Sequence, residues 1–336
     1  MTKINSHGND NIIKVFELLL KQIQHDTDYS SGKKHITNSF RLRAIAKVIK
    51  QLKAFPKTIT SSSQLSTIDG IGKNSLKRVD EILKTGSLAE IKITESSEEY
   101  LKFIDDLQKV INIGRRRAYD LFKNHNITSI SELKKRVKNN TINLPNNILK
   151  GLSYYDKIKE KIPRTDIETY SEIFNATTLE ISPKLFGITC GSYRRNKSTS
   201  NDIDYIITYA DYITKKDILK HNYLQDFVTA LKDKKIIVDS LTGDDVHTKY
   251  MGICNINGVL RRIDIRYMPY ESYYPAVLYF TGSKTTNQKM RQVAIINGYL
   301  LNEYGLYDEN DKMIRVNSEY DIFKEIGMEY IEPQDR

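Results

Sequence analysis

The sequence has little cysteine and no long apolar run. Only Cys190 and Cys254 occur in its 336 residues, and no Cys-x-x-Cys spacing is present. Neither a disulfide framework nor a zinc site is indicated, and a reducing compartment fits best. No apolar run approaches the roughly 18 residues of a membrane span, and the polar N-terminus lacks the apolar core of a secretory signal. We therefore expect an intracellular protein without a membrane partner.

A strong nuclear-import signal is also missing, so the composition leaves the compartment open. Positive charge, in contrast, is in excess: 52 Lys and Arg stand against 42 Asp and Glu, a formal net charge of +10. This excess favours a polyanionic partner, although by itself it says nothing about base sequence or strand number. The length allows two or more domains with a substantial core.

The segment 190–208 carries the clearest chemical signal. It contains the pair Gly191-Ser192, then two arginines, and enters a predicted strand as Asp202-Ile203-Asp204. Backbone N–H, hydroxyl and guanidinium groups of such a turn can hold phosphate oxygens. Alternate strand residues share a face, so Asp202 and Asp204 project together, and paired carboxylates are stabilised by a divalent cation. The combination indicates metal-assisted nucleotidyl transfer, whereas Asp-x-Asp alone would fit an ordinary solvated strand.

Two later segments extend this signal. A predicted strand over residues 260–267 carries Asp264 on the face opposite its isoleucine neighbours. Asp264 is either a salt-bridge partner of Arg262 or Arg266 or, if the two strands are neighbours, the third carboxylate of a two-metal site. The run Tyr279-Phe280-Thr281-Gly282-Ser283 suits the packing of a base and sugar against backbone, although an isolated aromatic pair is more typical of a core.

Near the N-terminus, apolar periodicity predicts helices over residues 11–24 and 38–53. The second is expected to turn seven apolar residues inward: Phe40, Leu42, Ala44, Ile45, Val48, Ile49 and Leu52. Its other positions are largely basic, namely Arg41, Arg43, Lys47, Lys50 and Lys53. Such a face is either solvated surface or a contact to a DNA backbone.

Two short segments repeat one design, a predicted helix, a tight turn and a basic helix start. They are Gly70-Ile71-Gly72-Lys73 and Asn112-Ile113-Gly114-Arg115. A helix N-terminus presents backbone N–H groups to a phosphate, and glycine lets the backbone approach it closely. One copy could be an ordinary helix-ending turn, but two copies in a basic chain predict DNA binding through the backbone, without sequence preference.

Together these motifs resemble the family X DNA polymerases, in particular the minimal polymerase beta type, from about residue 11 to the C-terminus. The resemblance implies an α+β fold with a helical lyase-like DNA-binding domain (1–95) and a helical DNA-binding subdomain with the second hairpin (96–155). A nucleotidyltransferase palm with a mixed β-sheet (156–268) and a small α+β nucleotide-binding subdomain (269–336) would follow. We expect no N-terminal interaction domain.

The resemblance also implies roles for individual residues. Asp202, Asp204 and Asp264 would bind two Mg²⁺ ions, with Mn²⁺ as a substitute, and Arg262 would steady Asp264. The residues expected at the dNTP are Gly191, Ser192, Arg195, Asn201, Tyr279, Phe280, Gly282, Lys284 and Asn287. The residues expected at DNA are Gly70, Gly72, Lys73, Asn112, Gly114, Arg115, Lys249, Arg266, Arg291 and Tyr304. Each hairpin would bind a monovalent cation.

The sequence departs from the family where a 5′-deoxyribose-phosphate lyase would act. Arg78 stands at the position of the Schiff-base lysine, and arginine stays protonated and cannot be that nucleophile. Ile36 and Asn74 replace two phosphate-binding lysines, and Phe40 replaces a tyrosine. Lyase activity is therefore expected to be weak, absent, or moved to Lys73, Lys77 or Lys84. In the nucleotide pocket, Asn201 replaces a glycine, Lys284 an acidic residue and Gln288 a lysine.

We expect a template-dependent DNA polymerase that fills short gaps during base-excision or end-joining repair. Its partners would be gapped or nicked duplex DNA, dNTP and a DNA ligase, and it would act as a monomer. Its location would be the nucleus in a cell, or a viral factory or virion if it is viral. The alternatives are a template-independent or other nucleotidyltransferase of the same fold, and a catalytically inactive DNA-binding scaffold.

Overall fold

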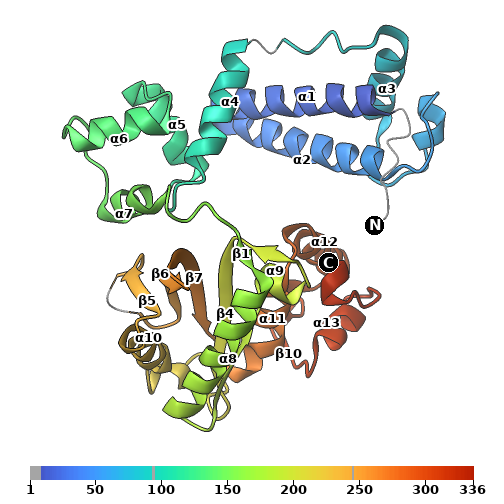
Figure 1. The fold of residues 1–336 in the computed structure, drawn as a ribbon. Coiled ribbons are helices and arrows are strands. Elements are labelled where there is room, and N and C mark those ends of the chain that lie inside the picture. The colour runs from blue at the N-terminus through green and yellow to red at the C-terminus, as the bar shows by residue number, and fades with distance from the viewer. Residues whose placement is uncertain (1–8, 93–94, 244–245) are drawn as a thin grey trace. The chain divides into compact units, whose positions relative to one another are not determined.

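The computed structural model describes residues 9–92, 95–243 and 246–336, and for residues 95–98 it describes the backbone only. The chain divides into two compact units, Met1–Leu144 and Pro145–Arg336 (Figure 1). None of the helices among the described residues has the length and apolarity needed to cross a membrane.

The described part of the first unit is helical. Its elements are α1 (Asp10–Asp28), α2 (Gly32–Ala54), the 3₁₀ turn η1 (Ser62–Leu65), α3 (Lys73–Thr85), α4 (Glu95–Leu107), α5 (Arg115–His125) and α6 (Ile130–Lys138). The apolar stripe of α1 packs on that of α2, with Phe16, Leu19, Val48 and Leu52 fully buried between them. The two predicted N-terminal helices are thus present, and α2 begins six residues earlier than the periodicity indicated.

The predicted inward face of α2 is wrong at two positions. Phe40 is 62% exposed and Ala44 is also exposed, whereas Ile45, Val48 and Ile49 are buried. Phe40 lies nine residues before Ile49, which places the two about 180° apart around the helix. Because the core face is narrow and centred between Ile45 and Ile49, Phe40 points to solvent with the basic residues.

The second unit contains the mixed sheet. Its helices are α7 (Asn146–Tyr154), α8 (Arg164–Ile181), α9 (Gly191–Arg194), α10 (Tyr223–Asp233), α11 (Tyr273–Thr281), α12 (Lys284–Ile296) and α13 (Glu319–Glu325), with 3₁₀ turns η2 (Asp217–Leu219), η3 (Tyr270–Ser272) and η4 (Pro333–Asp335). Its strands are β1 (Ile162–Pro163), β2 (Leu185–Thr189), β3 (Thr199–Ser200), β4 (Asp202–Tyr209), β5 (Ile237–Ser240), β6 (Lys249–Ile256), β7 (Val259–Tyr267), β8 (Leu300–Asn302), β9 (Gly305–Tyr307) and β10 (Met313–Ile314).

A five-stranded sheet in the order β2-β4-β7-β6-β5 forms the centre of this unit. Only the β4–β7 pair is parallel, and the other neighbours are antiparallel. Phe174 of α8 and Phe227 of α10 pack against Ile203, Tyr205 and Ile265, so both helices cover one face of the sheet. Residues that alternate with these isoleucines project from the opposite face.

The C-terminal part packs α11, α12 and α13 around a small three-stranded sheet, ordered β10-β9-β8. Its core contains Leu278, Met290, Leu306 and Phe323. A helical N-terminal part followed by a palm with a mixed sheet and a small α+β part is the predicted α+β fold, which is thereby confirmed. The finer division into four segments stays a prediction.

Candidate active site

Asp202, Asp204 and Asp264 meet on the open face of the five-stranded sheet. In the parallel pairing of β4 with β7, Asp204 lies opposite Asp264 and Asp202 lies opposite Arg262. One oxygen from each of the three carboxylates lies within 4.8 Å of the others. The strands are neighbours as the prediction required, so Asp264 joins the pair rather than serving only as a salt-bridge partner.

The surroundings of the three aspartates favour a cation. Burial, together with the charge of Asp264, raises the pKa of Asp204 to about 7. Burial also raises the pKa of Asp264, although the nearby cations Arg262, Lys249 and Arg266 oppose this effect. Among the described residues, the buried Oδ1 atom of Asp264 has no hydrogen-bond partner. Converging carboxylate oxygens, one of them unsatisfied, form the donor set that a hard divalent cation prefers.

The guanidinium of Arg262 neutralises part of the negative charge of the three aspartates. Its Nη2 atom forms an ion pair with Oδ2 of Asp202 and lies 3.5 Å from Oδ2 of Asp264. The predicted position of Arg262 beside Asp264 is therefore observed, and its guanidinium contacts Asp202 as well.

The turn after β2 lies directly beside the carboxylates. Cys190 donates its backbone N–H to the carbonyl of Asp204 (2.8 Å), and Gly191 has a φ of +59°. A Cβ atom at Gly191 would collide with Oδ2 of Asp204, so only glycine fits. The hydroxyl of Ser192 donates to Ser200 Oγ at 2.7 Å, which fixes that side chain at the turn.

Two arginines connect this turn to the end of α11. Arg195 donates to the carbonyl of Thr281, and Arg194 donates to the Thr281 hydroxyl (2.8 Å). Arg194 also forms a bidentate ion pair with Glu319, at 3.0 and 2.5 Å. Glu319 in turn accepts a hydrogen bond from Arg336, at 2.7 Å. Arg194 was predicted, with Arg195, to offer its guanidinium to phosphate, but here it is bound by Glu319. Its partnership with Glu319 and Arg336 could not be predicted, because these residues lie far from Arg194 along the chain.

The aromatic pair stands at the edge of the carboxylate site. The rings of Tyr279 and Phe280 meet edge to face at 5.0 Å, and Arg266 lies over the Phe280 ring at 5.2 Å. Phe280, Arg266, Asp204 and Asp264 together line a small hollow. The predicted sugar-packing residue Phe280 is therefore adjacent to two of the carboxylates.

The other predicted nucleotide and DNA residues of this unit are not part of the lining of that hollow. Asn287 donates to the Tyr279 carbonyl (2.7 Å), and Arg291 lies over the Tyr279 ring at 5.0 Å and 3.6 Å from Glu303. Gly282 has a φ of +71°, and the Gly282–Ser283 peptide is cis. Two more predicted residues, Asn201 and Lys284, are exposed. Lys249 lies opposite Arg266 across the β6–β7 pair. Tyr304 has its ring centroid 3.8 Å from Lys215 Nζ.

The two hairpins of the first unit share their backbone geometry. Gly72 and Gly114 are the N-cap residues of α3 and α5, with φ near −90° in both. Two residues earlier, Gly70 and Asn112 both adopt left-handed backbone, with φ of +89° and +66°. The repeated design predicted from sequence is thus present in three dimensions. Lys73 follows Gly72 as an exposed first residue of α3.

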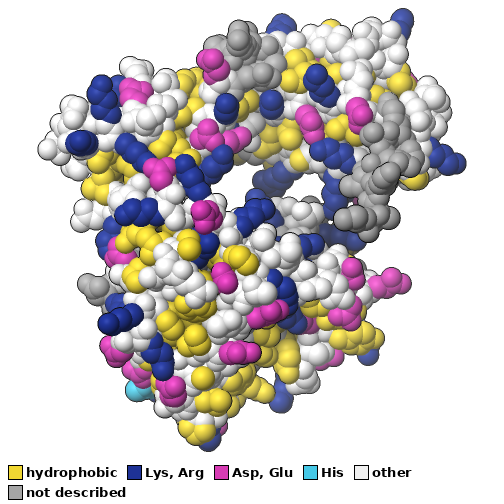
Figure 2. Space-filling view, viewed as in Figure 1, with side chains coloured by type: hydrophobic (Ala, Val, Ile, Leu, Met, Phe, Trp, Pro, Cys, Tyr) yellow, Lys and Arg dark blue, Asp and Glu magenta, His cyan; other side chains and the backbone are white. Residues whose placement is uncertain are grey.

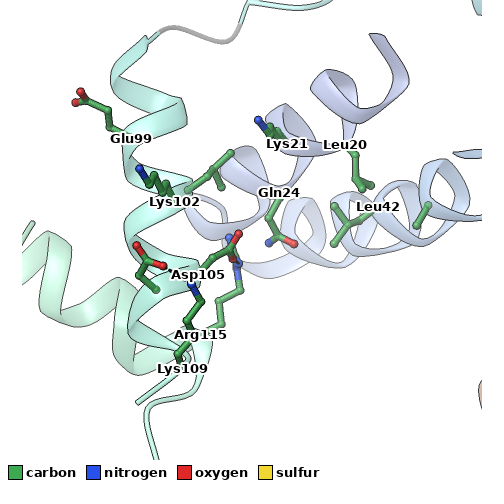
Figure 3. Close-up of a pocket in the computed structure, with 12 residues that line it drawn as sticks. Leu20, Lys21, Gln24, Leu42, Glu99, Lys102, Asp105, Lys109 and Arg115 are labelled. Carbon is green, nitrogen blue, oxygen red and sulfur yellow. Dashed lines mark hydrogen bonds and ion pairs between the residues drawn. The ribbon is translucent and has the colours of Figure 1, made fainter. Parts of the chain in front are cut away.

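Arg115, the matching residue of the second hairpin, is held by the protein itself. Its guanidinium donates to both carboxylate oxygens of Asp28 (2.8 and 2.5 Å), and Asp28 also accepts from the Tyr100 hydroxyl at 2.9 Å. Arg115 lines a cavity of about 910 Å³ between α1, α2 and α4 (Figure 3). Lys102 and Asp105 are among the other residues that line it, and no three-carboxylate cluster like that of β4 and β7 occurs among the described residues there.

Three family models match the chain. Their descriptions are "DNA polymerase beta palm" (residues 161–270), "DNA polymerase beta thumb" (276–336) and "Helix-hairpin-helix domain" (7–88). The chain belongs to the family X DNA polymerases. The predicted resemblance is thereby confirmed, and the palm match contains all three aspartates of this family X site.

Named relatives agree with the family X assignment. The chain is 27% identical over 316 residues to DNA polymerase lambda of Rattus norvegicus, covering 89% of this chain and 53% of that protein. It is 28% identical over 312 residues to DNA polymerase lambda of Arabidopsis thaliana, covering 86% and 56%. It is 25% identical over 331 residues to DNA nucleotidylexotransferase of Xenopus laevis, covering 89% and 64%. The chain thus spans less than two thirds of the length of each of these relatives.

Arg78 stands where the resemblance to family X polymerases places the Schiff-base lysine of the lyase reaction, and its side chain is held by an ion pair. Arg78 is bound by Glu90 through Nε (2.5 Å) and Nη2 (3.2 Å), and Arg41 lies 3.7 Å from the same carboxylate. The hydrogen bond from Arg78 lowers the pKa of Glu90 below its ordinary value. The candidate amines Lys73, Lys77 and Lys84 are all exposed.

Proposed function

We propose that the chain is a template-dependent DNA polymerase, which transfers a nucleotide from a dNTP to a primer 3′-OH. The observation that carries the proposal is the convergence of Asp202, Asp204 and Asp264 beside the Gly191 turn. Carboxylates that hold divalent cations next to a phosphate-binding turn provide what nucleotidyl transfer requires. The names of the relatives, DNA polymerase lambda among them, support the same reaction.

The ions would be Mg²⁺, with Mn²⁺ as a substitute, and the three aspartates would hold them. When bound, they supply a lowered pKa at the primer hydroxyl and charge neutralisation at the α-phosphate. Gly191 and Ser192 would offer N–H and hydroxyl groups to the triphosphate, which Arg195 would contact through its guanidinium. Tyr279 and Phe280 would pack against the nucleotide sugar.

The proposed DNA substrate is a gapped or nicked duplex. The hairpins at Gly72 and Gly114 present helix N-termini that suit phosphates on either side of a gap, with a monovalent cation at each turn. Filling a gap leaves a nick, so a phosphodiester-forming ligase would have to act next. We expect a monomer that works inside cells, in the nucleus, or in a viral factory or virion if it is viral.

We further propose that the chain does not remove a 5′-deoxyribose phosphate. Arg78 cannot form the Schiff base that this reaction needs, and its guanidinium is bound by Glu90. The repair role would then depend on a separate enzyme that cleans the 5′ end of the gap.

The deciding experiment is extension of a primer across a one-nucleotide gap, with Mg²⁺ and each dNTP supplied in turn. We expect incorporation that follows the template base, disappears with EDTA and disappears in Asp202→Ala. Lys197→Ala, at an exposed position of the same loop, is the matched control and should retain activity. Incorporation by Asp202→Ala at the wild-type rate would refute the catalytic assignment.

A second candidate function is template-independent nucleotide addition. It is favoured by the 25% identity to a relative named DNA nucleotidylexotransferase. The gap assay separates the two, because a template-independent enzyme would add nucleotides without regard to the template base and would also extend a single-stranded primer. The presence of all three carboxylates argues against an inactive scaffold, which would show no Mg²⁺-dependent incorporation at all.

A further inference from the structure

The two hairpins of the first unit belong to two separately packed bodies. The apolar core of α1, α2 and α3 contains no described residue of α4, α5 or α6. The latter helices have buried residues of their own, such as Leu107 and Leu121. The cavity of about 910 Å³ lies between α4 and the α1–α2 pair (Figure 3). The contacts that join the two bodies therefore determine the spacing between the hairpins at Gly72 and Gly114.

A buried ion pair joins the two bodies. The side chain of Asp28, at the end of α1, is 7% exposed, and that of Arg115, at the start of α5, is 27% exposed. The Arg115 guanidinium donates to both carboxylate oxygens of Asp28, and the hydroxyl of Tyr100 on α4 donates to Oδ2 of Asp28. Burial, together with the charge of Asp28, raises the pKa of Tyr100, so its hydroxyl keeps the proton that it donates. One carboxylate thus binds both helices of the second hairpin.

Aromatic rings surround this ion pair. His25 of α1 and Tyr29, the residue after α1, have ring centroids 5.3 and 5.5 Å from that of Tyr100. Tyr29 also meets Tyr119 of α5 edge to face at 5.4 Å. Apolar surroundings strengthen a hydrogen-bonded ion pair, and separating such a pair leaves a buried charge without a partner. We therefore expect Asp28 and Arg115 to stay paired when DNA is present.

The ion pair leaves the second hairpin with positive charge at its surface. Arg116 and Arg117, the two residues of α5 that follow Arg115, are exposed. Lys and Arg side chains are visible on the surface over α5 and α6 (Figure 2). Arg115 can therefore serve the contact between the two bodies while its neighbours remain available to a phosphate.

We propose that Asp28 is a positioning residue, which holds the two hairpins at one spacing and thereby limits the gap lengths that the polymerase accepts. The proposal rests on the proposed function for one step, namely that the hairpins bind phosphates on either side of a gap. Two linked binding sites act together best when their spacing matches the distance between their ligands. Fixing that spacing before DNA binds also reduces the conformational freedom lost on binding.

The first experiment measures the spacing without DNA or catalysis. Nitroxide labels are attached to Lys14→Cys on α1 and Lys135→Cys on α6, which are exposed positions, while the native Cys190 and Cys254 are buried. Double electron–electron resonance then gives the distribution of distances between the labels. Asp28→Asn should broaden this distribution about two-fold, because bodies without a strong interface move relative to one another.

Asp26→Asn is the matched control for both experiments. Asp26 lies two residues before Asp28 on α1, its side chain is 46% exposed, and its ion-pair contact is to His25 at 3.7 Å. The substitution removes the same charge from the same helix end and should leave the distance distribution unchanged. Thermal unfolding checks that each variant of the full chain is folded.

The second experiment measures gap selectivity by fluorescence anisotropy, with primer extension on the same substrates. For wild type on 5′-phosphorylated gaps of about one to six nucleotides, we expect affinity for the best length to exceed the weakest at least about ten-fold. For Asp28→Asn the spread should fall to about three-fold, because a flexible connection accepts many spans. Asp26→Asn should retain the wild-type profile.

Arg115→Gln separates positioning from a direct contact to DNA. If Arg115 acts through Asp28, then Asp28→Asn, Arg115→Gln and the double variant should give the same flattened profile. If Arg115 contacts DNA instead, Asp28→Asn would free its guanidinium and tighten binding at every gap length, whereas Arg115→Gln would weaken it. Such opposite effects would overturn the proposal.

Two further outcomes would also overturn it. An unchanged label distribution in Asp28→Asn would show that the ion pair does not hold the two bodies together. A broader distribution with an unchanged gap profile would remove the role of Asp28 in gap selection. Neither the label nor the anisotropy measurement requires catalysis. Gap-selective binding without primer extension therefore removes only the polymerase function, and extension with unselective wild-type binding removes only the positioning role.

Discussion

Asp204 lies opposite Asp264 across the parallel β4–β7 pair, and both carboxylates are partly buried. Two like charges in a partly buried site repel each other, and the only described guanidinium that contacts Asp264 is that of Arg262. The site therefore carries an electrostatic cost that a divalent cation would offset.

Asp264→Asn should remove most activity while preserving the fold. The amide has the same shape as the carboxylate but lacks its charge, so it weakens cation binding at the place where charge develops in the transition state. We expect extension at the one-nucleotide gap to fall at least about a hundred-fold, the scale of losing one electrostatic stabiliser. Single-turnover rates check this, and an unchanged rate would exclude Asp264 from the site.

Cation affinity should increase as the pH rises through neutrality. Burial and Asp264 raise the pKa of Asp204 to about 7, so below that pH a proton competes with the cation. Mn²⁺ or Mg²⁺ titrations at pH 6 and pH 8 should show tighter binding at pH 8, with more proton release at pH 6. Asp204→Asn should lose this dependence, and a pH-independent wild-type affinity would contradict the assignment.

The raised pKa of Asp204 should make the fold without bound cation less stable as the pH rises, whereas cation affinity increases. Between about pH 4 and pH 7 the folded chain keeps a proton on Asp204 that the unfolded chain has lost, so this group favours folding less as the pH rises. Other groups titrate too, so the measurement is the difference in unfolding temperature between wild type and Asp204→Asn, in EDTA. As the pH rises, the unfolding temperature of Asp204→Asn should increase relative to that of the wild type.

Glu319→Gln should destabilise the second unit strongly. Glu319 binds Arg194 and Arg336, and the side chain of Arg336 has no exposed surface. Removing the carboxylate leaves buried guanidinium charge unpaired, which costs about 3–5 kcal/mol. Glu180→Gln breaks the more exposed Lys234–Glu180 pair (2.9 Å) and should cost less than about 1 kcal/mol. Denaturant unfolding measures the free energy of unfolding of both variants. Equal decreases in the two variants would show that the ion pairs of Glu319 are not more stabilising than the exposed pair.

Borohydride trapping on an incised abasic site should give no adduct with the wild-type chain. Replacing Arg78 with lysine supplies an amine, but Glu90 would keep that amine protonated, because an adjacent carboxylate favours the charged form. We therefore expect Arg78→Lys alone to trap poorly and the double variant Arg78→Lys, Glu90→Gln to trap better. A strong wild-type adduct would instead identify another nucleophile, to be sought at Lys73, Lys77 and Lys84.

The sequence predicted the parts of the fold and site that depend on local periodicity. Strand alternation placed Asp202 and Asp204 on one face, and the repeated motif predicted two similar turns, at which the structure shows matching left-handed backbone for Gly70 and Asn112. It could not predict that Arg115 is bound by Asp28, or that Arg194 is bound by Glu319, because partners so distant along the chain are brought together only by tertiary packing.

The exposure of Phe40 was missed for a different reason. An apolar residue in a helical stripe is ordinarily assigned to the core, and the width of the core face is set by the helix that packs on it. Here α1 covers only the side of α2 that carries Ile45, Val48 and Ile49. Hydrophobicity alone therefore overestimated how far the buried face extends around α2.

The alternation along β4 and β7 has a consequence for how the gene can change. The isoleucines at 203, 263 and 265 are packed under α8 and α10, while the aspartates between them face the other way. Insertion or deletion of one codon inside either strand would exchange the two sets, driving carboxylates into the hydrocarbon core and isoleucines into the site. Length variation among descendants of this gene should therefore accumulate in the connecting loops and be purged from these two strands.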